Sequence, residues 1–181
     1  ESLSQPKMAP TLDNVSFTLQ PGSRTVVLGH NGSGKSTLAN LCNASLFPFS
    51  GEVLVDGTST TRVPSPQISS HVGMVRQDPT AQLVCATVFD EVAFGPANLG
   101  LPKEEIVSRV SQTLELCGIA DLASAQTHTL SGGQQQLVSI AAALSLRPCY
   151  LVLDEAFAQL DTRFRNHLSK LVNTLVANGM G

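Results

Sequence analysis

The sequence predicts an α/β fold in which strands alternate with helices and a helix-rich segment is inserted between two strands. Two short segments are typical of buried strands: residues 24–28, which end in Val26-Val27-Leu28, and the wholly apolar run at 150–153. Between Pro79 and about Leu146 the apolar residues follow helical spacing instead. Hydrophobic residues make up 42% and charged residues 14% of the 181 positions, as in one globular domain with a sizeable core.

The N-terminal third alternates strand and turn signals. Residues 15–19 alternate apolar and polar side chains, which predicts a half-exposed strand before the buried strand at 24–28. A helix follows and is expected to end near Pro48. Further strands are predicted at 51–57 and 71–75, with a loop containing a short helical turn between them.

The inserted segment carries clear helix-end signals. Thr87 and Asp90 form a capping-box pattern, and Gly95-Pro96 is expected to end that helix. Pro102 opens the next helix, and Gly118 is a plausible C-cap. Its apolar stripe predicts core packing: Ile106, Val110, Leu114 and Cys117.

The C-terminal part returns to the strand layer. A helix rich in alanine and leucine is predicted from Leu130 to about Arg147, ahead of the strand at 150–153. A final helix over 161–178 presents one apolar face, made of Phe164, Leu168, Leu171, Val172 and Leu175.

Composition excludes several classes of function. A net charge of −3 disfavours a nucleic-acid partner, and no apolar run approaches the roughly 20 residues that span a bilayer. The four cysteines are far apart, which predicts buried reduced thiols and argues against zinc sites and disulfides: Cys42, Cys85, Cys117 and Cys149. The four histidines are scattered, and none is assigned a catalytic role.

The most informative motif follows the strand at 24–28 and fits G-x-x-x-x-G-K-[ST]: Gly29-His30-Asn31-Gly32-Ser33-Gly34-Lys35-Ser36-Thr37. A strand before it and a helix after it separate it from an ordinary Gly/Ser-rich turn. Its backbone N–H groups can face one anion at a helix N-terminus. Lys35 can reach β- and γ-phosphates, and the Ser36 hydroxyl can bind Mg²⁺, so the loop predicts binding of a nucleoside triphosphate.

Two acids stand directly after the apolar strand at 150–153. That end of the sheet carries the nucleotide in phosphate-loop folds. Asp154 is placed to hold Mg²⁺, directly or through water, and Glu155 to polarise an attacking water. Carboxylates placed directly after four buried apolar residues lose hydration, which costs free energy unless a cation or a substrate compensates for it.

At this point the chain resembles the ATP-binding-cassette (ABC) ATPases over nearly its whole length. Residues 29–37 resemble the Walker A loop, Asp154 the Walker B aspartate and Glu155 the catalytic glutamate. Gln77 resembles the Q-loop glutamine, which in the family touches Mg²⁺ and relays motion to a membrane partner. Asp161 resembles the D-loop aspartate.

The segment Leu130-Ser131-Gly132-Gly133-Gln134 resembles the family's signature. Two glycines allow close backbone approach, and Ser131 offers a hydroxyl at a helix start, where an anion is favoured. The resemblance implies that this anion is the γ-phosphate on a second ABC ATPase subunit or domain, identical or different. Ser131 as a simple helix cap is compatible with that role.

The resemblance also implies a fold. It is a phosphate-loop NTPase core with a mainly parallel central sheet, a small antiparallel β part at the N-terminus and an inserted helical subdomain. We expect one domain over 1–181, with a nucleotide-binding core at 1–78 and 147–181 and a helical subdomain at 79–146. The adenine-stacking aromatic residue is missing from residues 1–10, and the chain stops before the family's switch-histidine strand, so an incomplete cassette is expected.

A narrower resemblance concerns the ATPases of energy-coupling-factor importers, which take up vitamins or cobalt and nickel ions. It rests on Gln77-Asp78-Pro79, Gln82, Thr87-Val88 and the run from Glu91 to Gly100. It implies ATP and Mg²⁺ as cofactors, a transmembrane coupling subunit as partner, and a peripheral place on the cytoplasmic side of the membrane. Three apolar residues are candidates for the coupling contact: Leu83, Val84 and Phe89.

Two other functions stay open at this point. One is a soluble ABC-type ATPase of translation or DNA repair, which usually carries two cassettes or a long coiled coil. The other is a phosphate-loop kinase, which would not require the signature at 131–134.

Overall fold

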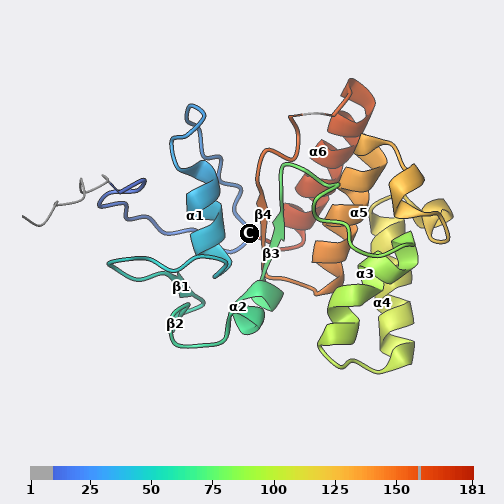
Figure 1. Cartoon of the computed structure of the whole chain (residues 1–181), viewed down its shortest axis with the longest axis horizontal. Coiled ribbons are helices and arrows are strands. Elements are labelled where there is room, and N and C mark those ends of the chain that lie inside the picture. Colours follow the sequence, from blue (N-terminus) through green and yellow to red (C-terminus); the bar gives the residue numbers. More distant parts are fainter. Residues whose placement is uncertain (1–9, 159) are drawn as a thin grey trace, which may run out of the picture.

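The computed structural model describes residues 10–158 and 160–181. The adenine-stacking prediction falls largely on residues 1–9, outside the described residues. The elements follow one another as α1 (Lys35–Cys42), β1 (Leu54–Val55), β2 (Thr58–Ser59), α2 (Ser65–His71), β3 (Val72–Val75), α3 (Val88–Asn98), α4 (Lys103–Leu116), η1 (Ala120–Leu122), η2 (Thr127–Thr129), α5 (Gly132–Ser145), β4 (Tyr150–Leu153) and α6 (Thr162–Ala177). In Figure 1, α1 and the β1–β2 hairpin lie on the left, helices α3 to α6 on the right, and β3 and β4 between them.

The two central strands pair in parallel. Val72 is aligned with Tyr150, and Val75 with Leu153. Helices α3, α4 and α5 lie between these strands in sequence, so the predicted α/β fold with a helix-rich insert is confirmed. Each residue of β4 is only half-buried, however, because the helices cover one side of the strand pair more closely than the other.

Two predicted strands are wrong. Within the described residues, 15–19 and 24–28 have no strand conformation, and Leu28 is 87% exposed. A strand needs the N–H and C=O groups of a neighbour, which an apolar run cannot supply by itself. On the edge of β4 away from β3, the N–H of Leu151 donates to the carbonyl of Gly181, and the Cys149 carbonyl accepts from the Gly181 N–H.

The predicted strand at 51–57 is shorter than expected. Only β1 is regular, and it turns back through Asp56 and Gly57 to pair antiparallel with β2. Both turn residues have positive φ, of 48° and 77°, which matches the twist of a tight hairpin. The predicted loop after it therefore contains β2 as well as helix α2.

The main hydrophobic core lies in the helical half. Helix α3 packs against α4 and α5, and α5 packs against β3. The predicted stripe on α4 is confirmed, because Val110, Leu114 and Cys117 are buried and Ile106 packs at the margin of the core. Helix α6 adds Leu168, Leu171 and Leu175.

Two helix ends differ from the prediction. Gly95-Pro96 does not stop α3, which continues to Asn98. Pro96 is fully buried, and a Cβ on Gly95 would come within 2.9 Å of Leu146, so close packing holds this last turn helical. Helix α1 ends at Cys42, well before Pro48, because Ala44 takes a positive φ of 59° and the Asn43 side chain accepts from the N–H of Ser45.

The cysteines are all free, as predicted, but they differ in burial. Cys117 is buried, and desolvation raises its pKa to about 12. Cys42 and Cys85 are half-buried and Cys149 is exposed, so the prediction of buried thiols is right for one of four. Apolar neighbours in sequence do not decide which side of a helix or strand faces the core.

Candidate functional site

The phosphate-binding motif forms a loop that ends at the start of α1. Gly34 is the N-cap residue, with φ 94°, and a Cβ there would lie 2.8 Å from Leu12 and 3.1 Å from Thr11. The positive φ therefore favours glycine at this position, and a larger residue would also displace the Leu12 and Thr11 side chains. Within the described part of the chain no side chain caps this helix, so the first N–H groups of α1 are left to face an anion.

The Lys35 ammonium is held by its own loop. Its Nζ donates to the carbonyls of Gly29 and His30, each at 3.1 Å. Glu155 Oε1 lies 3.6 Å from the same Nζ, and both side chains are partly buried. The lysine is thus positioned over the loop, with a carboxylate as its counter-charge.

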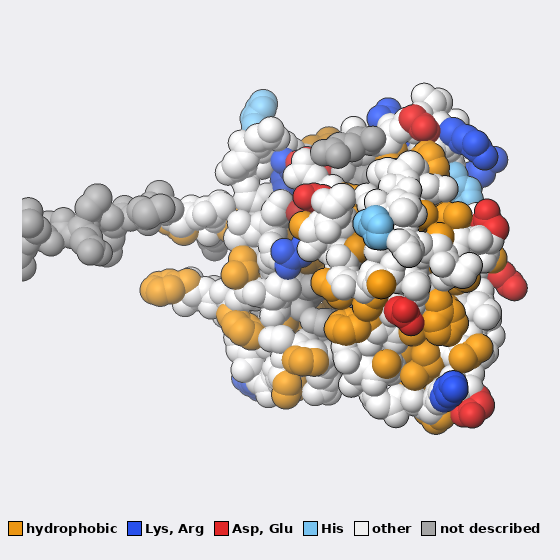
Figure 2. All heavy atoms as spheres, turned by 45° about the vertical axis from the view of Figure 1, so that its right-hand side comes forward, with side chains coloured by type: hydrophobic (Ala, Val, Ile, Leu, Met, Phe, Trp, Pro, Cys, Tyr) orange, Lys and Arg blue, Asp and Glu red, His pale blue; other side chains and the backbone are white. Residues whose placement is uncertain are grey.

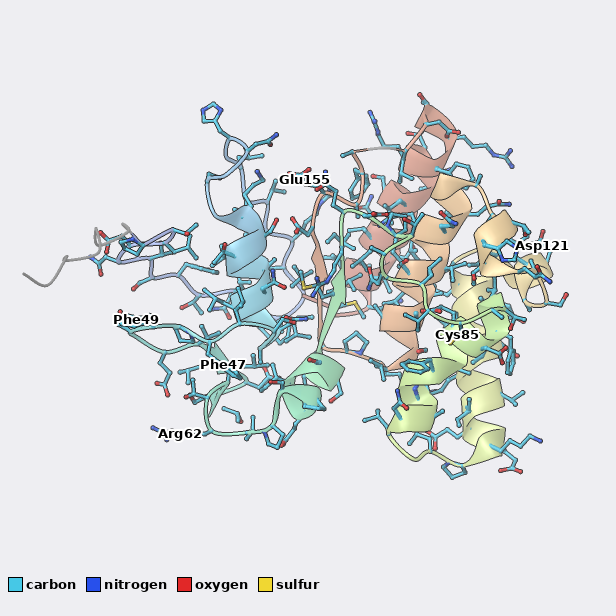
Figure 3. The ribbon with its side chains drawn as sticks, viewed as in Figure 1. Phe47, Phe49, Arg62, Cys85, Asp121 and Glu155 are labelled. Atoms are coloured by element: carbon cyan, nitrogen blue, oxygen red, sulfur yellow. The ribbon has the colours of Figure 1, made fainter. Side chains whose placement is uncertain are left out.

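The loop, Gln77 and Glu155 line one hollow of about 340 Å³. Four segments far apart in sequence line it, because Thr11 contributes as well. Figure 3 labels Glu155, which lies between α1 and the helical half. The lining residues are Thr11, Asn31, Gly32, Gly34, Lys35, Ser36, Thr37, Gln77 and Glu155. Among the predicted loop residues, Gly29, His30 and Ser33 lie outside this lining, and His30 is exposed.

The two acids after β4 take different positions. The Asp154 N–H donates to the Val75 carbonyl, which keeps the acid in line with the strand pair, and its side chain is half-buried. Glu155 has φ 52°, a left-handed conformation uncommon for a non-glycine residue. This turn directs Glu155 to the hollow, whereas Asp154 is not part of its lining.

The signature segment caps α5 and lies away from the hollow. The Ser131 hydroxyl accepts from the Gln134 N–H at 3.4 Å, and the Gln134 side chain accepts from the Ser131 N–H at 2.9 Å. Gly132 has open space around it, but a Cβ on Gly133 would lie within 2.6 Å of the Phe164 ring of α6. The two glycines therefore have different reasons to be glycine.

Asp161 has a local role that was not predicted from the sequence. Its Oδ1 accepts from the Phe164 N–H at 2.9 Å, so it is the N-cap of α6. Like the signature, Asp161 does not line the hollow. The first turn of α6 is therefore capped by Asp161 and places the Phe164 ring against Gly133 of the signature.

The candidate coupling residues divide into two kinds. Val84 is 69% exposed, whereas Leu83 and Phe89 are partly buried against the main core. Val84 therefore stays a candidate for the coupling contact, whereas Leu83 and Phe89 serve ordinary helix packing, the alternative that the sequence also allowed. Other apolar side chains of α3 and α4 are exposed on the same half of the molecule: Phe94, Leu99, Val107 and Leu116. Figure 2 shows hydrophobic side chains gathered on this face.

Sequence reasoning missed four residues with defined contacts. Thr11 lines the hollow. Two side chains fix the segment after Gln77: the Gln82 amide both donates and accepts hydrogen bonds, and the Glu91 carboxylate accepts them. His167 Nε2 lies 2.8 Å from the Cys117 carbonyl, at the end of α4. The only sequence signal for Glu91 is that it is a charged residue in a mostly apolar helix, where a buried carboxylate needs hydrogen-bond partners.

Comparison with known proteins agrees with this geometry. The sequence profile of the family described as ABC transporter matches residues 12–158. The chain belongs to the ABC transporter family. Among its relatives, the energy-coupling factor transporter ATP-binding protein EcfA1 of Symbiobacterium thermophilum is 47% identical over 165 residues, covering 91% of this chain and 58% of the relative.

Other relatives give the same picture. EcfA1 of Streptococcus thermophilus is 42% identical over 172 residues, covering 95% of this chain and 62% of the relative. A solved structure of cbiO1 from Clostridium perfringens, described as part of the ABC transporter complex cbiONQ, superposes with a TM-score of 0.83 at 37% identity. That match covers 93% of this chain and 68% of the solved one. The chain thus has the ABC ATPase fold, and it spans about three fifths of the length of these two curated relatives.

The residues at the hollow fit a magnesium nucleotide. Ser36 and Gln77 offer oxygen atoms there, and Asp154 follows β4 beside Glu155. Mg²⁺ prefers oxygen ligands and commonly takes one or two protein groups plus phosphate oxygens and water. In residues 10–158 and 160–181 no cluster of three or more acidic, histidine or cysteine ligands occurs. The same residues include no helix long and apolar enough to cross a membrane.

Proposed function

We propose that this protein is the ATP-binding and ATP-hydrolysing subunit of an energy-coupling-factor type importer. The observation that carries the proposal is the single hollow shared by the phosphate-binding loop, Gln77 and Glu155. A helix N-terminus without a side-chain cap and a lysine beside it suit a polyphosphate. Membership of the ABC transporter family supports ATP as the nucleotide.

Each residue has a chemical role in this proposal. The N–H groups at 34–37 and the Lys35 ammonium bind the phosphates, and Ser36, Gln77 and Asp154 hold Mg²⁺, which neutralises phosphate charge when bound. Glu155 orients the attacking water and accepts its proton. Lys35 stands 3.6 Å from Glu155, so a phosphate must compete with this carboxylate for the ammonium group.

The signature implies a second ABC ATPase subunit or domain, identical to this chain or different from it. Ser131, Gly132, Gly133 and Gln134 do not line the hollow of their own chain. In a head-to-tail pair of cassettes, Ser131 and the N–H groups of α5 would bind the γ-phosphate held by the partner, and Asp161 would lie at the same contact. Neither role conflicts with capping α5 and α6.

The transport role is supported by the names of the relatives. EcfA1 proteins are described as energy-coupling factor transporter ATP-binding proteins, and cbiO1 as part of a transporter complex. We infer that this chain works with a transmembrane coupling subunit, as a peripheral subunit on the cytoplasmic side of the membrane, in uptake of a vitamin or of cobalt or nickel ions. These relatives favour an importer over the soluble ABC-type ATPase and over the kinase.

Nucleotide binding tests the proposal directly. Calorimetry with Mg²⁺ and a non-hydrolysable ATP analogue should show one site on the wild-type chain and a loss of affinity of at least 100-fold in Lys35→Ala. Lys170→Ala, which removes an exposed lysine of α6, is the matched control and should bind as the wild type does. Wild-type protein that binds no nucleotide would refute the proposed function.

The role of Glu155 needs a second measurement. Glu155→Gln should bind the analogue as well as the wild type or a few-fold more tightly, because Lys35 loses its competing carboxylate. In the full-length protein, the same substitution should lower phosphate release at least 100-fold. Unchanged turnover would show that another group is the general base.

A further inference from the structure

The chain between β3 and α3 links the hollow to the helical half. Gln77 lies near its beginning and lines the hollow, although its own side chain is exposed. An exposed glutamine at the start of a loop has no fixed position unless the loop itself is held. The hydrogen bonds of the following residues show how it is held.

The outer edge of β3 is available for such a contact. The Val75 carbonyl accepts from the Asp154 N–H, so it points toward β4. Groups alternate in direction along a strand, and the Met74 carbonyl and the Arg76 N–H therefore point to the opposite edge. An unpaired sheet edge of this kind presents a carbonyl and an N–H to whatever lies beside it.

Gln82 occupies this edge with its side chain. Its Nε2 donates to the Met74 carbonyl at 3.0 Å, and its Oε1 accepts from the Arg76 N–H at 3.0 Å. One amide thus makes the two bonds that a residue of a neighbouring strand would make with its backbone. The loop from Arg76 to Gln82 is closed at both ends, with Gln77 inside it.

The remainder of the loop is bonded locally. The Pro79 carbonyl accepts from the N–H groups of Gln82 and Leu83 at 3.1 Å each. Asp78 Oδ1 accepts from the Thr80 N–H at 2.9 Å and from the Thr80 hydroxyl at 2.6 Å, and the hydroxyl bond lowers the pKa of Asp78. These contacts set the shape of the loop but do not attach it to β3.

A second side chain fixes the next residues to α3. The Glu91 carboxylate is 6% exposed, and its Oε2 accepts from the N–H groups of Val84 and Cys85 at 2.8 and 2.6 Å. Gln82 therefore attaches the loop to the strand, while Glu91 attaches its continuation to the helix. Gln82 is the attachment nearer to Gln77.

We propose that Gln82 is a positioning residue for Gln77: its amide pairs with the open edge of β3 and so fixes the loop that places Gln77 at the hollow. This inference rests on the proposed function, in which Gln77 contacts Mg²⁺ bound with the nucleotide. Without the Gln82 amide the loop loses its attachment to β3, and Gln77 no longer has one position beside the phosphates. The strand edge at Met74 and Arg76 is then exposed to water.

Two substitutions separate the two hydrogen bonds. Gln82→Met keeps the size of the side chain and removes both, whereas Gln82→Glu keeps an acceptor for the Arg76 N–H and removes the donor to Met74. Gln67→Met, at an exposed glutamine of α2, is the matched control. Hydrogen exchange of the nucleotide-free proteins should be at least 10-fold faster at the Arg76 amide in Gln82→Met, close to wild-type in Gln82→Glu, and unchanged in Gln67→Met.

The functional readout is the gain in affinity that Mg²⁺ gives to a non-hydrolysable ATP analogue, measured by calorimetry with Mg²⁺ and with EDTA. Gln77→Ala should reduce this gain several-fold, and Gln82→Met should reduce it to a similar extent. The affinity in EDTA should stay within about twofold of the wild type. The double variant should lose no more than Gln77→Ala alone, because Gln82 acts through Gln77.

Three results would overturn the proposal. They are multiplicative losses in the double variant, a Gln82→Met protein with the full Mg²⁺ gain, and an Arg76 amide that exchanges at the wild-type rate in Gln82→Met. A wild-type protein without nucleotide binding in either buffer would instead refute the proposed function, and the positioning role would fall with it. Rescue of the Mg²⁺ gain in Gln82→Glu, in step with protection of the Arg76 amide, supports the positioning role over a loss of fold.

Discussion

The two halves of the molecule are stabilised very differently. The helical half, from β3 onward, encloses a continuous core from Val75 to Leu175. The N-terminal half contributes Ala44 and Ile68 to one small cluster, which they form with Val72 of β3. Most of the exposed large hydrophobic side chains lie before Val55, and Phe47 and Phe49 point outward from that half in Figure 3.

The difference shows where each half obtains its shape. Buried apolar area holds α3, α4, α5 and α6 together without any ligand. The phosphate-binding loop instead depends on Gly34 and on hydrogen bonds of Lys35 to its own backbone. We therefore expect the helical half to respond to core substitutions and the N-terminal half to respond to nucleotide.

The largest expected effect is a core substitution in α5. Ile140 is fully buried, and Ile140→Ala should lower the free energy of unfolding by about 2–5 kcal/mol because it leaves a cavity. Leu54→Ala, at a side chain that is 56% exposed in β1, is the control and should cost less than about 0.5 kcal/mol. Denaturant unfolding measures both, and equal costs would contradict the comparison.

Nucleotide should act on the other half. At a concentration of 100 times the dissociation constant, a bound nucleotide stabilises the folded state by about 2.7 kcal/mol. Hydrogen exchange of the amides of α1 and of the loop before it should slow by up to about 100-fold, which is that free energy expressed as a rate ratio. Amides of α5 beyond its first turn should change much less, and uniform slowing of both halves would show that they unfold as one unit.

The two signature glycines should differ in their effect on stability. Gly133→Ala places a methyl group against Phe164 and should cost about 1–3 kcal/mol by overpacking. Gly132→Ala has open space and should be neutral or slightly stabilising, because alanine favours a helix over glycine. Thermal unfolding distinguishes them, and Phe164→Leu should recover part of the loss in Gly133→Ala.

The effect that is smallest near neutral pH is a pH dependence located in the core, because it appears only above pH 9. The pKa of Cys117 is about 12 in the folded chain and 9.0 without burial, so above pH 9 the unfolded thiol loses its proton while the folded one keeps it. The stabilisation that comes from the protonated Cys117 thiol is fully present below pH 9. Between pH 9 and about 12, the free energy of unfolding falls by about 1.4 kcal/mol for each pH unit. The difference in unfolding free energy between wild type and Cys117→Ala should shrink over that range, and a constant difference would contradict it.

Sequence patterns were sufficient where both partners of an interaction are near in the chain. Ser131 caps a helix that begins at the next residue, and the stripe on α4 repeats every turn, so both could be predicted. The strand predictions at 15–19 and 24–28 failed because pairing depends on a distant neighbour. Leu83 and Phe89 were candidates for an outer contact because neither an apolar residue in a loop nor one in the first turn of a helix shows by itself which side it faces.

The domain boundaries at 78 and 147 stay predictions. So do the assignments of Ser36, Gln77 and Asp154 to Mg²⁺ and of Asp161 to the contact between cassettes. The geometry places Ser36, Gln77 and Glu155 around one hollow, and nucleotide binding experiments decide their roles.

The sequence by itself determined the chemical groups of this protein: a glycine-rich loop with a lysine and a serine, two acids after an apolar strand, and a helix opened by Ser131. These are local, because backbone conformation, capping and charge depend on residues within a turn of each other. Only the tertiary structure decided that Glu155 meets Lys35, that Phe164 requires Gly133, and that the Gln82 amide lies on the edge of β3. Such contacts depend on how distant segments pack, and no short pattern contains that information.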